Sequence, residues 1–355
     1  MEKEILISII IPVHNRQELI KETLDSVLAQ SYQNWECIIV DDGSTDDTWK
    51  TLEGYFLKDS RFRIHKRNRE PKGAPTCRNI GLEKSKGEFI IFLDSDDVLG
   101  NWALESRNNY IEKYNRNKID VILSQSFEFN NQDLLNRQLR SSYGSNINTE
   151  YLNYNKPIGT PNPTWKKSFL QKNNITWYEK ISVFQDVMFH IEAFNYNPNF
   201  GWSEEIPDVF IRVENGYSKI SNSNELGKVL SRLTLLEDLS LFTESNVFKR
   251  RFKSDVFNRI EYLDYDDLKN LIIKHADLIK GHLGIVTFVY LRVYNSSRNI
   301  NGLHGFLYRI RPVITFKGRN KFLKKHNTIT EVLFKELKSK YTCYLTKNCN
   351  IKVLQ

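Results

Sequence analysis

A short apolar segment that ends in a cluster of acids constrains this sequence most. Residues 89–93 are five consecutive apolar side chains, and Asp94, Ser95, Asp96 and Asp97 follow directly. An apolar run of this length predicts a buried strand of a parallel sheet, and ligands of such sheets bind beyond the carboxyl ends of the strands. Three neighbouring carboxylates repel one another unless a cation lies among them. The segment therefore predicts a site for a divalent metal and a phosphate at one edge of a sheet.

Strand and helix signals alternate along the first 220 residues. Residues 5–11 and 35–40 are mostly apolar, interrupted only by Ser8 and Glu36, and segments with helical periodicity separate the three strands. This alternation predicts an α/β fold with a doubly wound, mostly parallel sheet. Further strands are expected at residues 61–65, 120–124 and 208–213.

The residues after the first strand are expected to start a helix. Pro12 should end the strand, because it cannot donate a ladder hydrogen bond. Asn15 and Glu18 have the spacing of a capping box. Asn15 is therefore predicted to cap the helix that follows.

Charge divides the 355 residues into two parts. The chain carries 51 Lys and Arg against 43 Asp and Glu, a net charge of +8. From Glu225 onward there are 24 basic and 12 acidic residues, which gives +12 and leaves −4 for the preceding residues. We expect an α/β domain over residues 1–222 and a basic, mainly helical region over residues 223–355.

One stretch of the C-terminal region is strongly basic. Between Asp277 and Glu331 there are ten Lys or Arg and no acidic residue, with aromatic residues interleaved. The composition of residues 278–330 fits peripheral contact with an anionic membrane. It also fits ordinary helical packing or a homo-oligomer interface, and nucleic acid is the least favoured partner.

Cysteine usage and hydropathy favour a cytoplasmic protein. The four cysteines show no CxxC spacing, and Cys37 and Cys77 fall in a predicted strand and helix. Neither a zinc site nor a disulfide framework is expected from this pattern. No apolar run reaches the roughly 18 residues of a membrane span. We expect a cytoplasmic location, free or peripheral at the inner face of the cell membrane.

Four motifs in the first hundred residues carry a family resemblance. The sequence reads SIIIPVHN at residues 8–15, VDDGSTD at 40–46, CRNIG at 77–81 and FLDSDD at 92–97. In this order and spacing the motifs resemble glycosyltransferase family 2, over about residues 5–220. The resemblance implies a GT-A fold, which is a Rossmann-like doubly wound sheet, with a nucleotide-sugar donor and Mn²⁺ or Mg²⁺. The donor half would be residues 1–100 and the acceptor half residues 101–222.

The resemblance also implies which residues form the donor site. Asp94 and Asp96 would form the metal site with hard oxygen ligands. Asp96 would bind the metal directly, and Asp94 would contact the ribose or a water bound to the metal. Asp42, or alternatively Asp41, would bind the base or ribose, and Arg78 would meet the diphosphate near a helix start. The other expected donor contacts are Pro12, Asn15, Asn68 and Ser95.

These assignments have structural alternatives. Asp94 and Asp96 would then only cap the following helix, and Asp41 and Asp42 would only form a turn, since Asp-Gly is a common turn dipeptide. Asp97 could equally be structural, and it is expected to be the most dispensable member of the acidic cluster.

A general base is expected on a helix over residues 182–194. Asp186 stands where the family has the aspartate of a Glu-Asp motif, and Gln185 replaces the glutamate. A carboxylate on a rigid helix is a suitable base for an attacking hydroxyl. One base with no covalent partner implies a single displacement that inverts the anomeric carbon. His190 is expected beside this site or at the surface.

Together these patterns predict a metal-dependent inverting glycosyltransferase. The donor would be a nucleotide sugar, with UDP as the expected nucleotide, and the acceptor a hydroxyl of a surface polysaccharide or lipid-linked glycan. Glu214 stands where the family's closing loop often has a histidine, so it would either ligate the metal or pair with Arg212. The competing interpretation is a non-catalytic protein that docks on a membrane or partner through a transferase fold.

Overall fold

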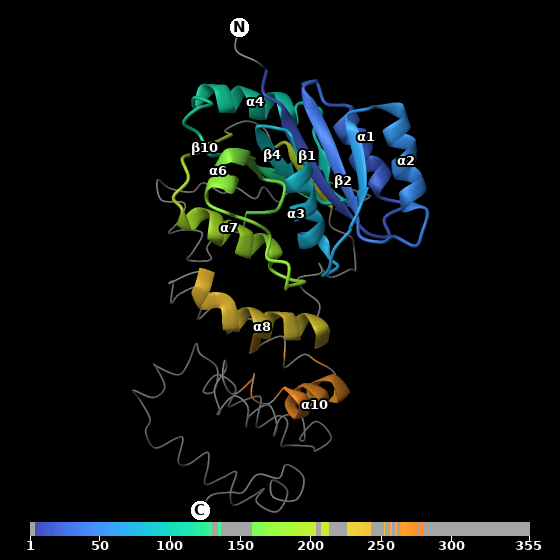
Figure 1. Cartoon of the computed structure of the whole chain (residues 1–355), viewed down its shortest axis with the longest axis vertical. Coiled ribbons are helices and arrows are strands. Elements are labelled where there is room, and N and C mark those ends of the chain that lie inside the picture. Colours follow the sequence, from blue (N-terminus) through green and yellow to red (C-terminus); the bar gives the residue numbers. More distant parts are fainter. Residues whose placement is uncertain are drawn as a thin grey trace, which may run out of the picture. The chain divides into compact units, whose positions relative to one another are not determined.

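The chain consists of two compact units, Met1–Asn222 and Ser223–Gln355. The computed structural model, drawn in Figure 1, describes residues 4–129, 134–135, 158–203, 207–212 and 226–242, together with scattered residues between 252 and 279. Glu214 and the basic stretch 278–330, apart from Ile279, lie outside the described residues.

A seven-stranded sheet forms the centre of the described part of the first unit. Its strand order is β10-β6-β9-β4-β1-β2-β3. In that order the strands are Phe200–Trp202, Val121–Leu123, Pro163–Lys166, Phe89–Phe92, Ile7–Val13, Trp35–Asp41 and Phe62–Lys66. All neighbouring pairs are parallel except those of β9, which runs antiparallel to both β4 and β6. The prediction of a mostly parallel sheet is confirmed, and the antiparallel β9 was not predicted.

A smaller sheet follows directly from the acidic cluster. Its order is β5 (Val98–Leu99), β11 (Val209–Arg212), β7 (Ser126–Phe129) and β8 (Leu134–Leu135). β11 pairs antiparallel with β5 and parallel with β7. Because β5 begins directly after Asp97, this sheet holds the far end of the acidic loop.

The two faces of the central sheet are covered by different helices (Figure 1). Ile7, Ile9 and Ile11 share one core with buried side chains of α1 (Ile20–Leu28), α2 (Thr48–Lys58) and α4 (Ala103–Lys113). Ile10 points the other way, as alternation along a strand requires, and meets α3 (Ala74–Lys84). A Cβ atom on Gly81 of α3 would lie 2.3 Å from Ile10 Cγ2, so a glycine is needed for this close approach.

Two local predictions around the first strand are wrong. β1 continues through Pro12 to Val13, because β4 ends opposite Ile10 and leaves Pro12 without a strand partner on that side. α1 begins only at Ile20 and has no side-chain cap. Asn15 instead adopts a left-handed φ of 47°, a conformation that asparagine tolerates better than most residues.

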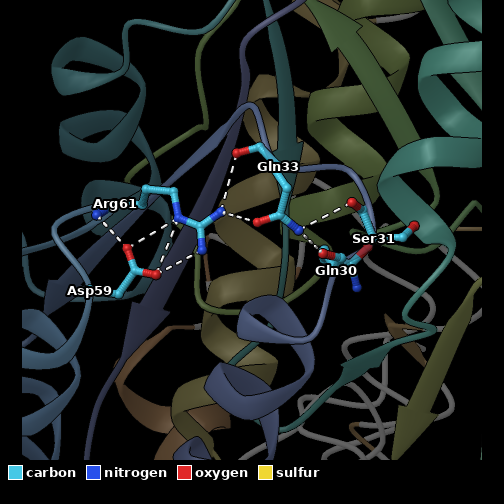
Figure 2. A network of polar contacts seen from close by, with 5 residues as sticks. All are labelled: Gln30, Ser31, Gln33, Asp59 and Arg61. Atoms are coloured by element: carbon cyan, nitrogen blue, oxygen red, sulfur yellow. Dashed lines mark hydrogen bonds and ion pairs between the residues drawn. The ribbon is translucent and has the colours of Figure 1, made fainter.

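Polar contacts at the amino-terminal ends of the strands close a local network (Figure 2). Arg61 donates bidentately to Asp59 at 2.7–3.2 Å and also to the backbone and side-chain oxygens of Gln33. The Gln33 amide donates in turn to the carbonyls of Gln30 and Ser31. These bonds fix the α1–β2 connection to the start of β3, so this edge of the sheet has a structural role.

Two further helices complete the described part of the first unit, α6 (Lys167–Lys172) and α7 (Gln185–Asn195). The described part of the second unit is mainly helical, with α8 (Leu226–Phe242) and α10 (Tyr265–Lys274) in contact. None of the helices in the described residues is long and apolar enough to cross a membrane.

Candidate active site

The loop after β4 places its four polar residues in different environments. Asp94 and Asp96 are about a third exposed, with relative side-chain exposures of 34% and 36%. Ser95 and Asp97 are buried. The two members of the predicted metal pair are therefore the two that solutes can reach.

Arg78 connects Asp94 to the helix that carries the predicted base. Its Nη2 donates to Asp94 Oδ1 at 2.5 Å, and its Nη1 donates to Gln185 Oε1 at 2.9 Å. The guanidinium lies 4.3 Å from the centroid of the Trp177 ring, in cation–π geometry. Arg78 is 4% exposed, and its Nε is buried without a hydrogen-bond partner in the described part of the chain. The positively charged guanidinium of Arg78 is thus held between the acidic loop and the start of α7.

Asp96 is surrounded by other cationic groups. Arg16 Nη2 lies 3.8 Å from Asp96 Oδ2, and Arg212 Nε donates to the Asp96 carbonyl at 3.1 Å. Burial and then the negative charge of Asp94 raise the pKa of Asp96, and Arg16 and Arg212 oppose that shift. Asp94 thus acts on Asp96 as a like charge, which favours a cation between the two carboxylates.

Asp97 has a structural role. Its Oδ1 accepts a hydrogen bond from the backbone N–H of Arg212 at 3.0 Å. The Arg212 guanidinium pairs with Glu22 of α1 and lies over Phe129 of β7. Asp97 therefore fastens the acidic loop to β11.

Asp186 lies on a helix, as predicted, and falls in the first turn of α7 because that helix begins at Gln185. Its Oδ1 accepts a hydrogen bond from the Val187 N–H at 2.9 Å. Burial raises the pKa of Asp186; the Val187 hydrogen bond lowers it, the charge of Asp94 raises it, and that of Arg78 lowers it. These couplings place Asp186 in the electrostatic environment of Asp94 and Arg78, although about ninety residues separate it from the acidic loop. A raised carboxyl pKa is the property expected of a general base.

The two carboxylates at the carboxyl end of β2 have different partners: one closes a turn and the other forms an ion pair. Asp41 Oδ2 accepts hydrogen bonds from the backbone N–H groups of Gly43 and Ser44, both at 3.0 Å. This is the turn geometry that the structural alternative described. Asp41 Oδ1 is buried and has no partner among the described residues. Asp42 Oδ1 accepts from Arg67 Nε at 2.5 Å.

Asn15 joins the loops that follow β1 and β2. Its Oδ1 accepts from the Thr45 N–H at 2.8 Å, and its N–H donates to Ser44 Oγ at 3.0 Å. Pro12 is buried in β1, and Asn68 is exposed in the loop after β3. Within the described residues, no hydrogen bond or ion pair brings Asn68 into contact with the other candidates.

The buried thiol of Cys77 lies near charged groups from both sides of the predicted donor site, the carboxyl end of β2 and Arg78. This buried thiol in α3 has its pKa raised to about 12, by burial first and then by the charge of Asp42, with a smaller contribution from Asp41. Arg67 and Arg78 act in the opposite direction. The charges of Asp41, Asp42, Arg67 and Arg78 thus all act on this thiol, so the carboxyl end of β2 and Arg78 share one electrostatic environment.

His190 is neither at the surface nor a candidate base. It is 1% exposed and stacks on Trp165 at a centroid distance of 6.2 Å. Burial lowers its pKa to about 3, so the imidazole is neutral at physiological pH. The surface alternative for His190 is wrong, because this side of α7 packs into an aromatic core.

The donor set fits a hard divalent cation only in part. Asp94 and Asp96 offer carboxylate oxygens, which Mg²⁺ and Mn²⁺ prefer. Within the described residues, no group of three or more His, Cys, Asp or Glu side chains is arranged to hold a metal. Magnesium sites of this kind use one or two carboxylates and complete their coordination with substrate phosphates and water. The pair therefore fits a metal that arrives with a diphosphate.

Sequence reasoning missed three side chains of this site: Arg16, Trp177 and Arg212. Arg16 directly follows Asn15, the last residue of the first motif, so its position beside a predicted site residue was a usable signal. Arg212 was considered only as a partner of Glu214. Trp177 lies in a segment without a motif and reaches Arg78 because Asn79 bonds both its backbone N–H and its carbonyl, each at 2.8 Å.

Fold and site together define the class: an α/β protein of the GT-A type, with an acidic pair at the carboxyl ends of parallel strands. Residues 8–182 match the model of the family described as Glycosyl transferase family 2. The chain belongs to this family through its first unit, which confirms the resemblance seen in the motifs.

Named relatives are similar over part of their length. An uncharacterized glycosyltransferase of Rickettsia bellii is 30% identical over 247 residues, which cover 66% of this chain and 33% of the relative. The Escherichia coli enzyme WfgD, a UDP-Glc:alpha-D-GlcNAc-diphosphoundecaprenol beta-1,3-glucosyltransferase, is 36% identical over 152 residues, covering 42% of this chain and 54% of the relative. The chain thus spans about a third to a half of these relatives.

A solved structure supports the fold. Residues 1–349 of S. aureus TarS, in complex with UDP-GlcNAc, superpose with a TM-score of 0.57 and 18% identity, covering 93% of this chain and 92% of that one. At this identity the likeness shows the fold alone, and it confirms the predicted GT-A type.

Proposed function

We propose that this chain is a metal-dependent inverting glycosyltransferase. It transfers a sugar from a UDP-sugar to a hydroxyl of a lipid-linked glycan or surface polysaccharide. The observation that carries the proposal is the position of Arg78, which bonds Asp94 of the DxD pair and Gln185 beside Asp186. The names of the E. coli relative and of the TarS complex support a UDP-sugar donor, and the former supports a lipid-linked acceptor.

The donor would bind beyond the carboxyl ends of β1, β2 and β4. Asp94 and Asp96 would hold the metal together with diphosphate oxygens, and the ion would neutralise charge on the departing nucleoside diphosphate. Arg78 would bind the diphosphate, since a guanidinium suits phosphate geometry. The base and ribose would meet Asp42 or Asp41, with Pro12, Asn15, Asn68 and Ser95 as the remaining contacts.

Asp186 would take the proton from the acceptor hydroxyl. The raised pKa of this carboxyl suits that role, because proton transfer is most effective when the pKa of the base approaches the working pH. A single base with no covalent partner supports a one-step displacement with inversion, as in inverting hydrolysis with a sugar hydroxyl in place of water.

The proposal also assigns a separate role to each part of the chain. Residues 1–100 would bind the donor, residues 101–222 the acceptor, and residues 223–355 would bring the enzyme to the inner face of the membrane through the basic stretch 278–330. Co-sedimentation with anionic and neutral vesicles at low salt tests the last point. Binding to anionic vesicles alone supports it, and no binding to either excludes it.

A thermal-shift screen tests the donor. The unfolding temperature of the full chain is measured with UDP, UDP-sugars and GDP-sugars, each with Mn²⁺ or with EDTA. A bound ligand raises the unfolding temperature by mass action. We expect a shift that requires both the UDP moiety and Mn²⁺. A shift with GDP-sugars alone contradicts the UDP assignment, and no shift with any nucleotide supports a docking protein instead.

A further inference from the structure

The indole ring of Trp177 contacts one residue from each of three segments that build the candidate site. The guanidinium of Arg78 on α3 lies 4.3 Å from the ring centroid. Phe189 of α7 stacks on the indole at a centroid distance of 5 Å or less, 4.5 Å, with an interplanar angle of 16°. Phe92, at the end of β4, meets the ring edge-on at 5.0 Å. Trp177 therefore touches the arginine itself, the helix that carries the candidate base and the strand that leads to the acidic loop.

The backbone of Trp177 is fixed to the helix that carries Arg78. Trp177 lies in the connection between α6 and α7, outside any helix or strand. The side chain of Asn79 accepts a hydrogen bond from the Trp177 N–H and donates one to the Trp177 carbonyl, each at 2.8 Å and each buried. Because Asn79 directly follows Arg78 in α3, these two bonds set the position of the indole relative to the guanidinium.

The polar atom of the indole has no role in this arrangement. Trp177 is 1% exposed, and its Nε1 is buried without a hydrogen-bond partner in the part of the chain that the structure describes. A buried tryptophan N–H usually finds a partner. What Trp177 contributes here is therefore the face of its ring, which another aromatic side chain could also supply.

Arg78 needs a flat neighbour because its hydrogen bonds fix only part of its orientation. Asp94 and Gln185 each accept from one terminal nitrogen, and these bonds hold the edge of the planar guanidinium. A ring stacked on a guanidinium also opposes tilting of the plane, and the attraction is stronger where water is excluded, as it is for a side chain that is 4% exposed.

We infer that Trp177 is a positioning residue, whose ring face holds the Arg78 guanidinium in the orientation that the donor diphosphate meets. The inference rests on the proposed function, in which Arg78 binds that diphosphate. It assigns to Trp177 an effect on donor affinity that acts through Arg78 and is separate from its contribution to the aromatic core.

Substitutions at position 177 separate the ring face from the space it fills. Trp177→Phe keeps an aromatic face, whereas Trp177→Leu and Trp177→Met supply only apolar volume; the methionine variant serves if the leucine variant unfolds. The affinity for UDP with Mn²⁺ is measured by titration calorimetry. We expect it to fall about tenfold in the two aliphatic variants and to stay within about threefold of wild type in Trp177→Phe.

Trp165→Leu is the matched control for lost packing. Trp165 is also 1% exposed and also has a buried Nε1 without a partner among the described residues. It stacks on Phe169 at a centroid distance of 6.1 Å and has no described contact with Arg78. Urea unfolding should show a loss of stability similar to that of Trp177→Leu, while UDP affinity stays within about twofold of wild type.

A double-mutant cycle locates the effect at Arg78. In an Arg78→Gln background, Trp177→Leu or Trp177→Met should cause no further loss of UDP affinity, because the group through which the ring acts is gone. A role of Trp177 in packing alone predicts the same loss in both backgrounds.

Four outcomes overturn the inference: wild-type UDP affinity in the aliphatic variants, an equal loss in Trp177→Phe, an equal loss in Trp165→Leu, or an undiminished loss in the Arg78→Gln background. Failure of the proposed function has a different signature. In that case the wild-type chain itself binds no UDP with Mn²⁺, and the inference falls with it.

Discussion

Replacing Asp186 by asparagine should separate donor binding from sugar transfer. The asparagine side chain keeps one oxygen that can accept the Val187 N–H, now bonded to Asp186 Oδ1 at 2.9 Å, so the first turn of α7 should survive. The substitution removes the carboxylate that α7 contributes to the surroundings of Arg78 and Asp94. It therefore removes the base and leaves the donor contacts in place.

The size of the effect follows from the role of the carboxylate. General-base catalysis contributes about 10²- to 10⁴-fold, which is roughly 3–5 kcal/mol of barrier. Because burial and the charge of Asp94 raise the pKa of Asp186, this base is better matched to neutral pH than an exposed aspartate. We therefore expect kcat to fall about 10³-fold or more, with UDP affinity unchanged or slightly tighter.

The assay measures UDP release from UDP-sugar with acceptor, together with calorimetric UDP binding. Glu192→Gln is the matched control, since it removes a carboxylate from the same helix and Glu192 has no described contact with the site. Burial raises the pKa of Glu192 to about 7, so Glu192→Gln also shows whether losing any carboxyl with a raised pKa on α7 lowers kcat. Turnover by Asp186→Asn within tenfold of wild type would remove Asp186 as the base.

Three further predictions concern the metal, pH and stability. Asp96→Ala should abolish the part of UDP binding that depends on Mn²⁺, seen by calorimetry with and without the ion; an unchanged Mn²⁺ dependence would exclude Asp96 as a ligand. Transfer requires deprotonated Asp186, so kcat should rise with pH through a pKa above that of an ordinary aspartate, because that pKa is raised; an acid limb at the ordinary value would contradict this. Asp208→Asn should lower the free energy of unfolding of the first unit by about 3–5 kcal/mol in urea unfolding. Arg107 is 0% exposed and pairs with Asp208 at 2.8 and 3.0 Å, so the variant would leave a buried guanidinium without its counter-charge. A loss below about 1 kcal/mol would show that another group compensates the charge of Arg107.

The acidic strand ends were readable from the sequence for a physical reason. Strands buried on both faces read as continuous apolar runs, so residues 35–40 and 89–93 mark β2 and β4 closely. The carboxyl ends of parallel strands share one edge, and the carboxylates after β2 and β4 therefore had to lie near each other. The helix carrying Asp186 was readable from its apolar period, although it begins at Gln185 rather than at residue 182.

Long-range pairing was not readable. β9 is only four residues long, follows a Pro-rich loop and inserts antiparallel between β4 and β6. Nothing local distinguishes such a segment from loop. Trp177 and Arg212 reach Arg78 and the acidic loop from distant segments of the chain, and a single sequence carries no record of those contacts. Asn15 had the spacing of a helix cap, but its bonds to Ser44 and Thr45 of the neighbouring loop took precedence.

The central claim is that Asp94 and Asp96 form a metal-dependent donor site in a working transferase. Donor turnover by the full chain, measured as UDP release from UDP-sugars with Mn²⁺ and again with EDTA, tests it most directly. We predict release that EDTA abolishes, that added Mn²⁺ restores and that Asp96→Ala lacks. Equal release with EDTA, or no release from any nucleotide sugar in the presence of Mn²⁺, would contradict it.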